Sequence, residues 1–375
     1  MKRDLHYYAL LALCRYCGFD KKSARIISYA SQYVDDAKIN LITIRNPKPG
    51  IECDLINSKP AFYNMATCQA YFKIKTFDYA AMINNTCAFH FVPGCDGISF
   101  TSKLRCKEAS PVIMDILNQA LTDPDLVKLG IVFHAYADTY SHQGFSGLPS
   151  KVNDIKKCNA INEVYLESGD FLLYLFKHVF IERFDAVFDR IIPAYGHGQA
   201  MSLPDLPYLI WTYTYDCSEE FHGEYRAVSI DNRERYQRAI VHIKHYLLQY
   251  LFLHPQFGDK DKKKYDFDRL MKQLIQKGSD KNREEAWISF MLEQGMYCER
   301  DIPTIVYYED DWVSEAFIDY DKRIFNNRRV LEAKITKNFD HTCWYRFYLA
   351  VKWYKKLFFT SCRKHALFIS DGISI

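Results

Sequence analysis

The sequence predicts a mainly all-α protein, a multi-helix bundle with one small irregular or β-type excursion near residues 39–60. Apolar side chains recur with helical period in several segments, of which 4–17 and 231–252 are the clearest. Helix-start signals precede another segment, since the Thr122-Asp-Pro-Asp125 stretch offers capping side chains and an early proline. Together these patterns favour helices packed around a shared apolar core.

Two breaks in the helical pattern suggest how the chain is organised. Residues 39–60 contain the Asn46-Pro-Lys-Pro-Gly50 turn after a short apolar stretch, which is typical of a hairpin or an irregular loop. The chain becomes polar and charged from His254 to Lys264. We therefore expect a helical domain over residues 1–254 and a mostly helical C-terminal extension over residues 255–375.

The composition is that of an ordinary folded protein. The 375 residues are 49% hydrophobic and 25% charged, and the net charge is only +3, so bulk charge favours neither nucleic acid nor an anionic membrane. The N-terminal segment does not have the pattern of a signal peptide, and no uncharged apolar run is long enough to cross a bilayer. We therefore expect a cytoplasmic protein whose 12 cysteines are reduced.

The segment 341–359 mixes aromatic residues with bases such as Arg346 and Lys352. A helix of this kind could lie on nucleic acid or transiently on a membrane surface. The other interpretation, which the pattern favours, is that its aromatic side chains pack inward on the domain. The sequence does not indicate an oligomeric state.

The most informative motif is a row of metal-ligating residues on the helix predicted after Asp125. His134, Asp138 and His142 are spaced four residues apart, and each step turns about 400°, so all three project from one face. The two histidines lie roughly 12 Å apart along the axis, which suits two ions with the carboxylate between them. The other interpretation is a set of hydrogen-bonded core residues, because burying them without partners would cost several kcal/mol.

Further residues of this type lie elsewhere in the chain. Asp35 and Asp36 end a predicted helix, where carboxylates oppose the helix dipole and a cation would compensate them; a solvated helix end is the other interpretation. His90 precedes a Pro-Gly turn and suits either a ligand or a buried histidine bonded to backbone. His197 stands between two glycines, where backbone can pass close to a site, and His6 lies in the first turn of the first helix.

Taken in chain order, these residues resemble the ligand order of the zinc-dependent phospholipase C and P1/S1 nuclease superfamily, an all-helical fold with a three-zinc cluster. The resemblance implies the metal ligands His6, Asp35, Asp36, His90, His134, Asp138, His142 and His197. Residues 1 to 210 also resemble an uncharacterised bacterial helical family with His-Tyr-Tyr-Ala, Gln-Tyr-Val-Asp-Asp, His-x3-Asp-x3-His-Gln-Gly-Phe and Pro-Asp-x-Pro blocks.

The sequence also departs from the superfamily. There the processed N-terminal amine ligates a zinc ion, whereas here residues precede His6, so we expect that ligand to be missing. The superfamily's last histidine is followed four residues on by Glu, whereas His197 is followed by Met201. Either Asp205 replaces that Glu or the third metal is absent, so both a two-metal and a three-metal site stay open. The rival HD phosphohydrolases need an adjacent His-Asp pair, which this sequence lacks.

The resemblance implies a metal-dependent hydrolase of phosphoesters, in which the substrate is a phospholipid, a nucleotide or nucleic acid. Two or three Zn²⁺ or other divalent ions would polarise a phosphoryl oxygen and make hydroxide available from bound water near neutral pH. Whichever of Asp35 and Asp36 is not a ligand would orient the attacking water as a base. Residues 1–254 would then form the metal-binding catalytic domain.

Side chains near the predicted cluster are expected to hold the substrate: Tyr7, Tyr136, Tyr140, Gln143 and Asp205. For the tyrosines, packing in the core is the other interpretation. A second hypothesis is a non-catalytic interaction protein in which metal ions only hold helices together. In that case each metal shell should be closed, with no water on the ion.

Overall fold

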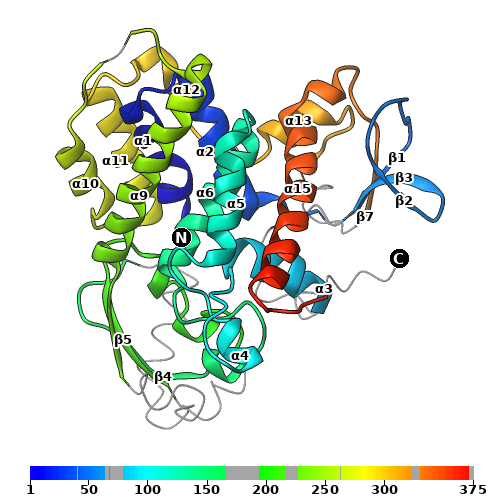
Figure 1. The fold of residues 1–375 in the computed structure, drawn as a ribbon. Helices are drawn as coiled ribbons and strands as arrows, with labels where there is room; N and C mark the ends of the chain where they lie inside the picture. Colours follow the sequence, from blue (N-terminus) through cyan, green and yellow to red (C-terminus); the bar gives the residue numbers. More distant parts are fainter. Residues whose placement is uncertain are drawn as a thin grey trace.

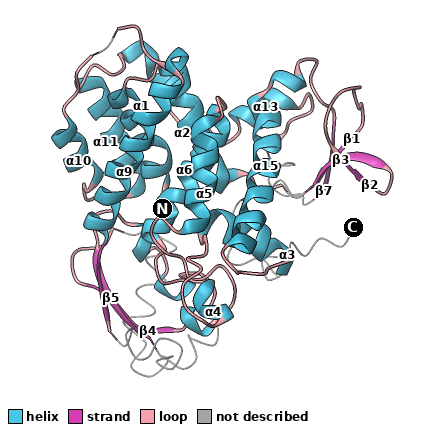
Figure 2. Cartoon of the chain, in the orientation of Figure 1, coloured by secondary structure: helices cyan, strands magenta, loops and turns pink. Residues whose placement is uncertain are grey.

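The computed structural model describes residues 1–39, 41–63, 67, 79–165, 194–215, 227–261, 263–322 and 330–370. Helices dominate these residues, and two small β-sheets lie at the edges of the helical body (Figure 1 and Figure 2). The mainly helical fold class predicted from the sequence is therefore confirmed.

Two sets of helices make up the described part of the chain. The longer ones form the bundle: α1 (Leu10–Cys17), α2 (Lys21–Asp36), α5 (Pro111–Thr122), α6 (Leu126–Ser141), α9 (Asn232–Leu253), α10 (Phe267–Leu274), α11 (Asp280–Glu293) and α15 (Cys343–Lys364). The connecting segments include two π-helical stretches, η1 (Asp4–Ala9) and η3 (Met82–His90). They also include short α- or 3₁₀-helical segments: α3 (Tyr79–Ala81), α4 (Phe100–Lys103), η4 (Lys151–Asn153), η5 (Gly198–Ala200), η6 (Leu203–Asp205), η8 (Pro255–Phe257), η9 (Glu299–Asp301), α12 (Ile302–Ile305), α13 (Asp311–Ala316) and η10 (Phe339–His341). The helices predicted over 4–17 and 231–252 correspond to η1 with α1 and to α9.

Helix α6 lies at the centre of the bundle, between α2, α5, α9 and α15. It begins after Asp125, whose side chain accepts a hydrogen bond from the backbone N–H of Val127 at 2.9 Å. A Cβ at Gly130 would lie 2.3 Å from the carbonyl oxygen of Ile27 on α2. Glycine therefore lets α2 lie directly against α6, and this close approach brings the end of α2 next to the predicted ligand row.

The excursion predicted near residues 39–60 is a β-sheet that extends slightly beyond those bounds. Strands β2 (Asp54–Ile56), β3 (Lys59–Tyr63) and β1 (Leu41–Ile44) are antiparallel neighbours. Strand β7 (Val330–Ala333) adds to β1 in parallel, with Leu41 opposite Val330. The sheet thus joins a segment near the start of the chain to one near its end.

A second sheet was not predicted from the sequence. Strands β4 (Ile155–Ala160), β5 (Ile210–Tyr215) and β6 (Val228–Asp231) form an antiparallel sheet below the helices in Figure 1. Its inward side chains, such as Trp211 and Tyr213, build a small core of their own. This sheet supports the loop that carries His197 and Asp205.

One large apolar core connects the two predicted domains. Tyr8 and Ile27 from the N-terminal helices belong to the same buried cluster as Trp287 of α11 and Phe347 of α15. The division between residues 254 and 255 stays a prediction about folding units. In the folded chain, the C-terminal helices pack directly on the N-terminal ones.

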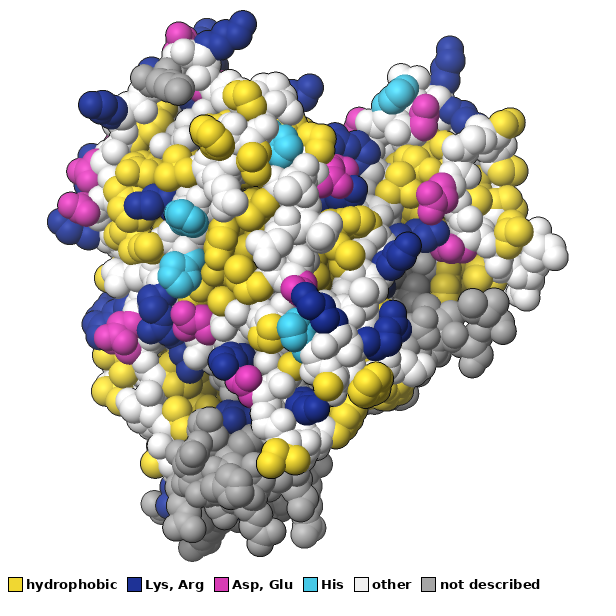
Figure 3. Space-filling model, viewed as in Figure 1, with side chains coloured by type: hydrophobic (Ala, Val, Ile, Leu, Met, Phe, Trp, Pro, Cys, Tyr) yellow, Lys and Arg dark blue, Asp and Glu magenta, His cyan; other side chains and the backbone are white. Residues whose placement is uncertain are grey.

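The outer face in Figure 3 shows basic and acidic side chains scattered among hydrophobic and uncharged atoms rather than gathered by sign. Helix α15 buries its aromatic side chains, including Trp344 and Tyr354, as the packing interpretation of 341–359 requires. Among the described residues, no helix combines the length and the apolar character needed to span a bilayer. Binding to nucleic acid or to a membrane surface stays a prediction.

Candidate metal centre

Three groups of metal-ligating side chains lie around the ends of α2 and α6. Group A is His6, His134 and Asp138; group B is Asp35, His90 and His134; group C is His142, His197 and Asp205. Within each group the ligand atoms lie within 4.8 Å of one another. Because two ligands on one ion are at most about 4 Å apart, small side-chain rotations would close each group around a cation.

Asp138 is the central residue of this arrangement, as its place in the α6 row predicts. Its Oδ1 lies 3.1 Å from Nε2 of His6, and its Oδ2 lies 3.2 Å from Nδ1 of His90 and 3.4 Å from Nε2 of His134. The carboxylate is 1% exposed. A buried carboxylate whose two oxygens face different imidazoles has the geometry of a bridging ligand.

Group C lies at the C-terminal end of α6, where His142 caps the helix. Nε2 of His142 is 3.1 Å from Oδ1 of Asp205, and Nε2 of His197 is 3.5 Å from Oδ2 of the same carboxylate. The loop with Asp205 is held by Asn232, whose side chain donates to the carbonyls of Leu203 at 2.7 Å and Leu206 at 2.8 Å. Asp205, predicted as a substrate residue or as a replacement ligand, thus lies among the ligating groups.

Backbone carbonyls orient three of the imidazoles. Nδ1 of His142 lies 2.6 Å from the carbonyl of His90, and Nδ1 of His197 lies 2.7 Å from that of Met201. Nε2 of His90 lies 2.9 Å from the carbonyl of Thr67. Since a ring nitrogen must donate to a carbonyl, the other nitrogen faces the cluster, where it is an acceptor in the neutral form of the ring. This is the usual arrangement of metal-ligating histidines.

His6 and His134 stack on each other with ring centroids 3.9 Å apart. Both rings are buried, and Nδ1 of each has no hydrogen-bond partner among the described residues. Burial is the largest influence on His6 and holds its pKa well below the ordinary value. Two stacked imidazoles with Nε2 directed at a carboxylate fit the donor set of a divalent ion.

The two neighbouring carboxylates of α2 have different environments. Asp35 is 29% exposed, and its Oδ1 lies 3.8 Å from both His90 and His134. Asp36 instead accepts hydrogen bonds from the hydroxyl of Tyr307 at 2.8 Å and from Gln32 at 3.2 Å. Asp35 is therefore brought to the cluster, whereas Asp36 contacts Tyr307 and Gln32.

The amino group of Met1 also lies in the cluster, where it contacts two carboxylates. It donates to Oδ1 of Asp138 at 2.6 Å and lies 3.2 Å from Oδ1 of Asp205. Burial alone would lower its pKa, but the facing carboxylates outweigh burial and raise it to about 11. Because a protonated amine does not ligate a metal ion, the expectation that a terminal amine is missing from the metal ligands stays a prediction.

The pKa values of the carboxylates also depend on the balance between burial and neighbouring charges. Burial would raise the pKa of Asp138 and that of Asp205, yet the Met1 amino group and the imidazoles hold both well below their usual range. For Asp35, burial raises the pKa and outweighs the opposite influence of His134 and His90. For His197, burial lowers the pKa to about 4. Lowered pKa values for Asp138 and Asp205 favour ionised carboxylates, and those of His6 and His197 favour neutral imidazoles, which are the forms that bind a metal ion.

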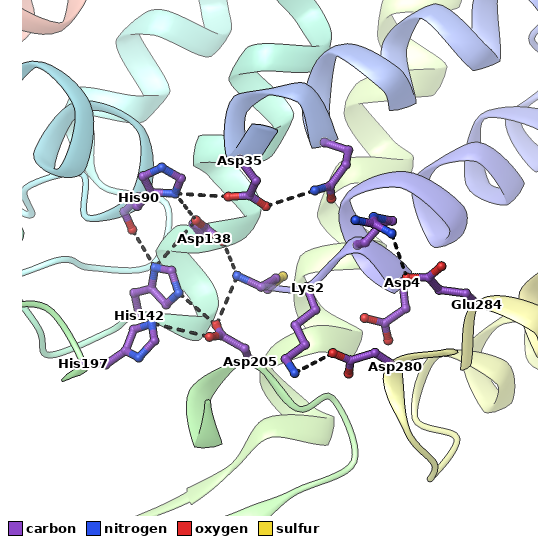
Figure 4. A pocket seen from close by; sticks show the side chains of 13 residues that line it. Lys2, Asp4, Asp35, His90, Asp138, His142, His197, Asp205, Asp280 and Glu284 are labelled. Carbon is purple, nitrogen blue, oxygen red and sulfur yellow. Dashed lines mark hydrogen bonds and ion pairs between the residues drawn. The ribbon is translucent and has the colours of Figure 1, made fainter. Parts of the chain in front are cut away.

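Each group contributes at least one side chain to the lining of one cavity of about 410 Å³, which His6 and His134 do not reach. Figure 4 shows His90, His142 and His197 on one side of it and Lys2, Asp280 and Glu284 on the other. The volume is in the range of small-molecule sites. The second wall includes α11, from the region that the sequence presents as a C-terminal extension.

The remaining predicted substrate residues lie away from this cavity. Tyr7 is fully buried against Tyr307, with ring centroids 5.0 Å apart. Tyr136 and Tyr140 are also fully buried and share a hydrogen bond of 2.9 Å between their hydroxyls. Gln143 donates to Glu108 at 3.0 Å. The structure therefore places the tyrosines in the core, which was the other interpretation of these residues.

Comparison with known proteins shows one match. Residues 1–362 match a family described as "Family of unknown function (DUF6765)". The chain belongs to this family. No curated protein and no solved structure matches the chain, so no relative connects it to the phospholipase C and P1 nuclease superfamily. The DUF6765 family supplies no activity, and the case for one depends on the geometry of the centre.

Sequence reasoning missed the cavity wall formed by Lys2, Asp280 and Glu284. Charged residues on a helix normally face solvent, so their presence on α11 gives no signal of a cavity. Arg283 offered a weak signal, because it is a charged residue on the side of the helix that carries Trp287 and Phe290. It pairs with Asp4 at 2.7 Å in the core.

Proposed function

We propose that this DUF6765 protein is a metal-dependent hydrolase of phosphoesters. The observation that carries the proposal is that groups B and C share no residue, that both contribute side chains to the lining of one cavity, and that both have an imidazole within 4 Å of Asp138. Two ions held a few ångströms apart are suited to phosphoryl chemistry, because they polarise a phosphoryl oxygen and supply a water of lowered pKa. The ligand order also resembles that of the zinc phospholipases.

The chain's own residues would have distinct roles. His90, His134 and Asp35 would hold one ion, and His142, His197 and Asp205 the other, with Asp138 between them. Asp35 is the most exposed of the three carboxylates and faces the cavity, so a water there can reach it. We therefore assign the ligand role to Asp35 rather than to Asp36, whose carboxylate accepts hydrogen bonds from Tyr307 and Gln32.

The donor set supports zinc as the metal. Each group combines imidazole nitrogens with a carboxylate oxygen, a combination that suits Zn²⁺ and that Mg²⁺ or Ca²⁺ uses rarely. Groups A and B compete for His134, so the described residues support two ions more strongly than three.

The test is element-resolved metal analysis of the purified protein, followed by hydrolysis of p-nitrophenyl phosphate and bis(p-nitrophenyl) phosphate. We expect about two zinc ions per chain and an activity that a chelator abolishes and zinc restores. Absence of stoichiometric metal, or activity that survives full metal removal, would contradict the proposal.

A matched pair of variants sharpens this test. Asp35→Asn should lose most activity, whereas Asp36→Asn, at the adjacent position of the same helix, should keep it. Equal loss in both variants would show that the end of α2 matters only for folding. Melting temperatures of the two proteins identify that outcome.

One observation favours a second candidate, an interaction protein without catalysis. The Met1 amino group already lies between Asp138 and Asp205 and compensates their charge. A centre satisfied in this way could serve only to hold helices together. In that case, added zinc should leave the melting temperature unchanged or raise it without producing hydrolysis.

A further inference from the structure

The wall opposite the metal centre indicates what the substrate carries besides its phosphate. We propose that the site takes the phosphate ester of a small polyhydroxyl alcohol, a sugar or polyol phosphate, and that Glu284 and Arg3 bind its hydroxyl groups. This inference rests on the proposed function and names the substrate class of the same site.

The opposite wall consists of alternating cationic and anionic groups. Lys2 contacts Asp280 at 2.7 Å, and Arg3 lies 3.6 Å from Glu284. These four side chains are partly exposed and line the cavity. Hydroxyl groups both donate and accept hydrogen bonds, so an alcohol with several of them can satisfy donors and acceptors that alternate in this way.

Arg3 and Glu284 are the incompletely satisfied pair on this wall. Their 3.6 Å contact is longer than a good charge-assisted hydrogen bond, and Nε of Arg3 is buried without a hydrogen-bond partner among the described residues. Burial raises the pKa of Glu284 to about 7, which means that Arg3 does not fully compensate the carboxylate. A ligand hydroxyl between them would donate to the carboxylate and accept from the guanidinium.

The lining argues against the other classes of phosphoester. Among the described residues that line the cavity there is no Phe, Tyr or Trp, so a nucleobase would find no aromatic side chain to stack on. Met1 is the one large apolar residue of the lining, so an acyl chain would meet mainly charged groups. A compact hydrophilic alcohol meets neither difficulty.

The structure fixes this end of the cavity firmly enough for recognition. Arg283, next to Glu284 on α11, is 2% exposed and bonds to Asp4 at 2.7 Å and to Asp280 at 2.7 Å. It also donates to the carbonyl of Gly278 at 2.6 Å. These buried contacts join α11 to the N-terminal segment and keep the wall at a set distance from the metal centre.

The experiment compares sorbitol 6-phosphate with p-nitrophenyl phosphate as substrates of the zinc-loaded full-length protein. Wild-type protein should have the higher kcat/KM for sorbitol 6-phosphate. In Glu284→Gln the ratio of the two kcat/KM values should fall about tenfold, mainly through KM, as expected for one lost hydrogen bond to a charged group. Arg3→Gln should act in the same direction, and melting temperatures verify folding.

Glu285→Gln is the matched control, because Glu285 is 63% exposed on the same helix and does not line the cavity. It should leave the ratio unchanged. The inference is overturned if the wild type prefers the aryl ester, or if Glu284→Gln and Glu285→Gln change the ratio equally. Either result leaves the hydrolase proposal standing.

If neither ester is hydrolysed, calorimetry should compare the binding of sorbitol 6-phosphate with that of inorganic phosphate. If sorbitol 6-phosphate then binds about tenfold more tightly than inorganic phosphate and Glu284→Gln removes the difference, the ligand class holds and the hydrolase proposal fails. If the two bind equally, both fail.

Discussion

The two ends of the cavity are built differently. At the metal end the imidazoles are enclosed, and backbone carbonyls fix the orientation of His90, His142 and His197. At the opposite end, Arg3 and Glu284 carry longer, partly exposed side chains that meet at 3.6 Å. Short side chains with fixed orientations suit ions that need a set coordination geometry, and longer ones suit a ligand whose shape varies.

The largest expected effect is at the metal end. His134→Ala removes a ligand common to groups A and B, so we expect the loss of about one metal ion and at least about a hundredfold lower activity. Metal analysis and phosphoester hydrolysis measure both. His341→Ala, at a histidine that is 83% exposed, is the control. Unchanged metal content in His134→Ala would show that this end of the cavity does not bind metal through His134.

The opposite end should matter most for stability. Arg283→Met leaves the carboxylate of Asp4 buried and unpaired, which should lower the free energy of unfolding by about 3 kcal/mol. Urea denaturation measures the change, and Lys281→Met, at an exposed position of α11, should have little effect. If both variants are equally stable, the buried pair does not hold this wall in place.

Close packing of α2 on α6 should connect stability to metal binding. In Gly130→Ala the new methyl group meets the carbonyl of Ile27, so the helices must separate, at a cost of about 1–3 kcal/mol. Asp35 then moves away from His134, and zinc affinity should fall together with stability. Denaturation and zinc titration test this. Lower stability with unchanged affinity would show that group B does not depend on this spacing.

The smallest effect concerns the pH dependence of stability. The pKa of Glu284 is raised to about 7, so between its unfolded value and pH 7 the folded chain binds more protons than the unfolded chain. Stability should therefore fall as pH rises through this window, by on the order of 1 kcal/mol for a partly solvent-screened group. Arg3 and Arg283 oppose the shift, and Asp4 and Asp280 support it.

Glu284→Gln should remove this contribution. Its advantage over the wild type in urea denaturation should grow from pH 5 to pH 8. Parallel pH profiles of the two proteins would show that Glu284 is compensated in the folded state, and the proposed hydroxyl subsite would then lose its support.

The helical fold and the ligand row were predictable because both depend on local periodicity. His134, Asp138 and His142 repeat every four residues, and such a repeat fixes their common face. The same periodicity could not place Tyr136 or Tyr140, because a helix buried on every side gives no signal of which face meets the cavity.

Long-range features were beyond the sequence for a different reason. The pairing of Asp4 with Arg283 joins residues that are 279 apart, and neither has a local pattern that specifies the other. The choice between Asp35 and Asp36 also depended on a distant residue, since Tyr307 binds Asp36. The sequence alone left Asp35 and Asp36 as equal candidate ligands. Their different tertiary contacts are what favour Asp35.

The parallel pairing of β1 with β7 has a consequence for synthesis of the chain. Residues 41–44 leave the ribosome long before their partners at 330–333. At about 5–20 residues per second, the intervening stretch takes roughly 15–60 s to translate, and during that time the edge of β1 has no neighbour on that side. The nascent protein is therefore expected to need a chaperone over this interval, and expression at lower temperature with added chaperone should increase the yield of native protein.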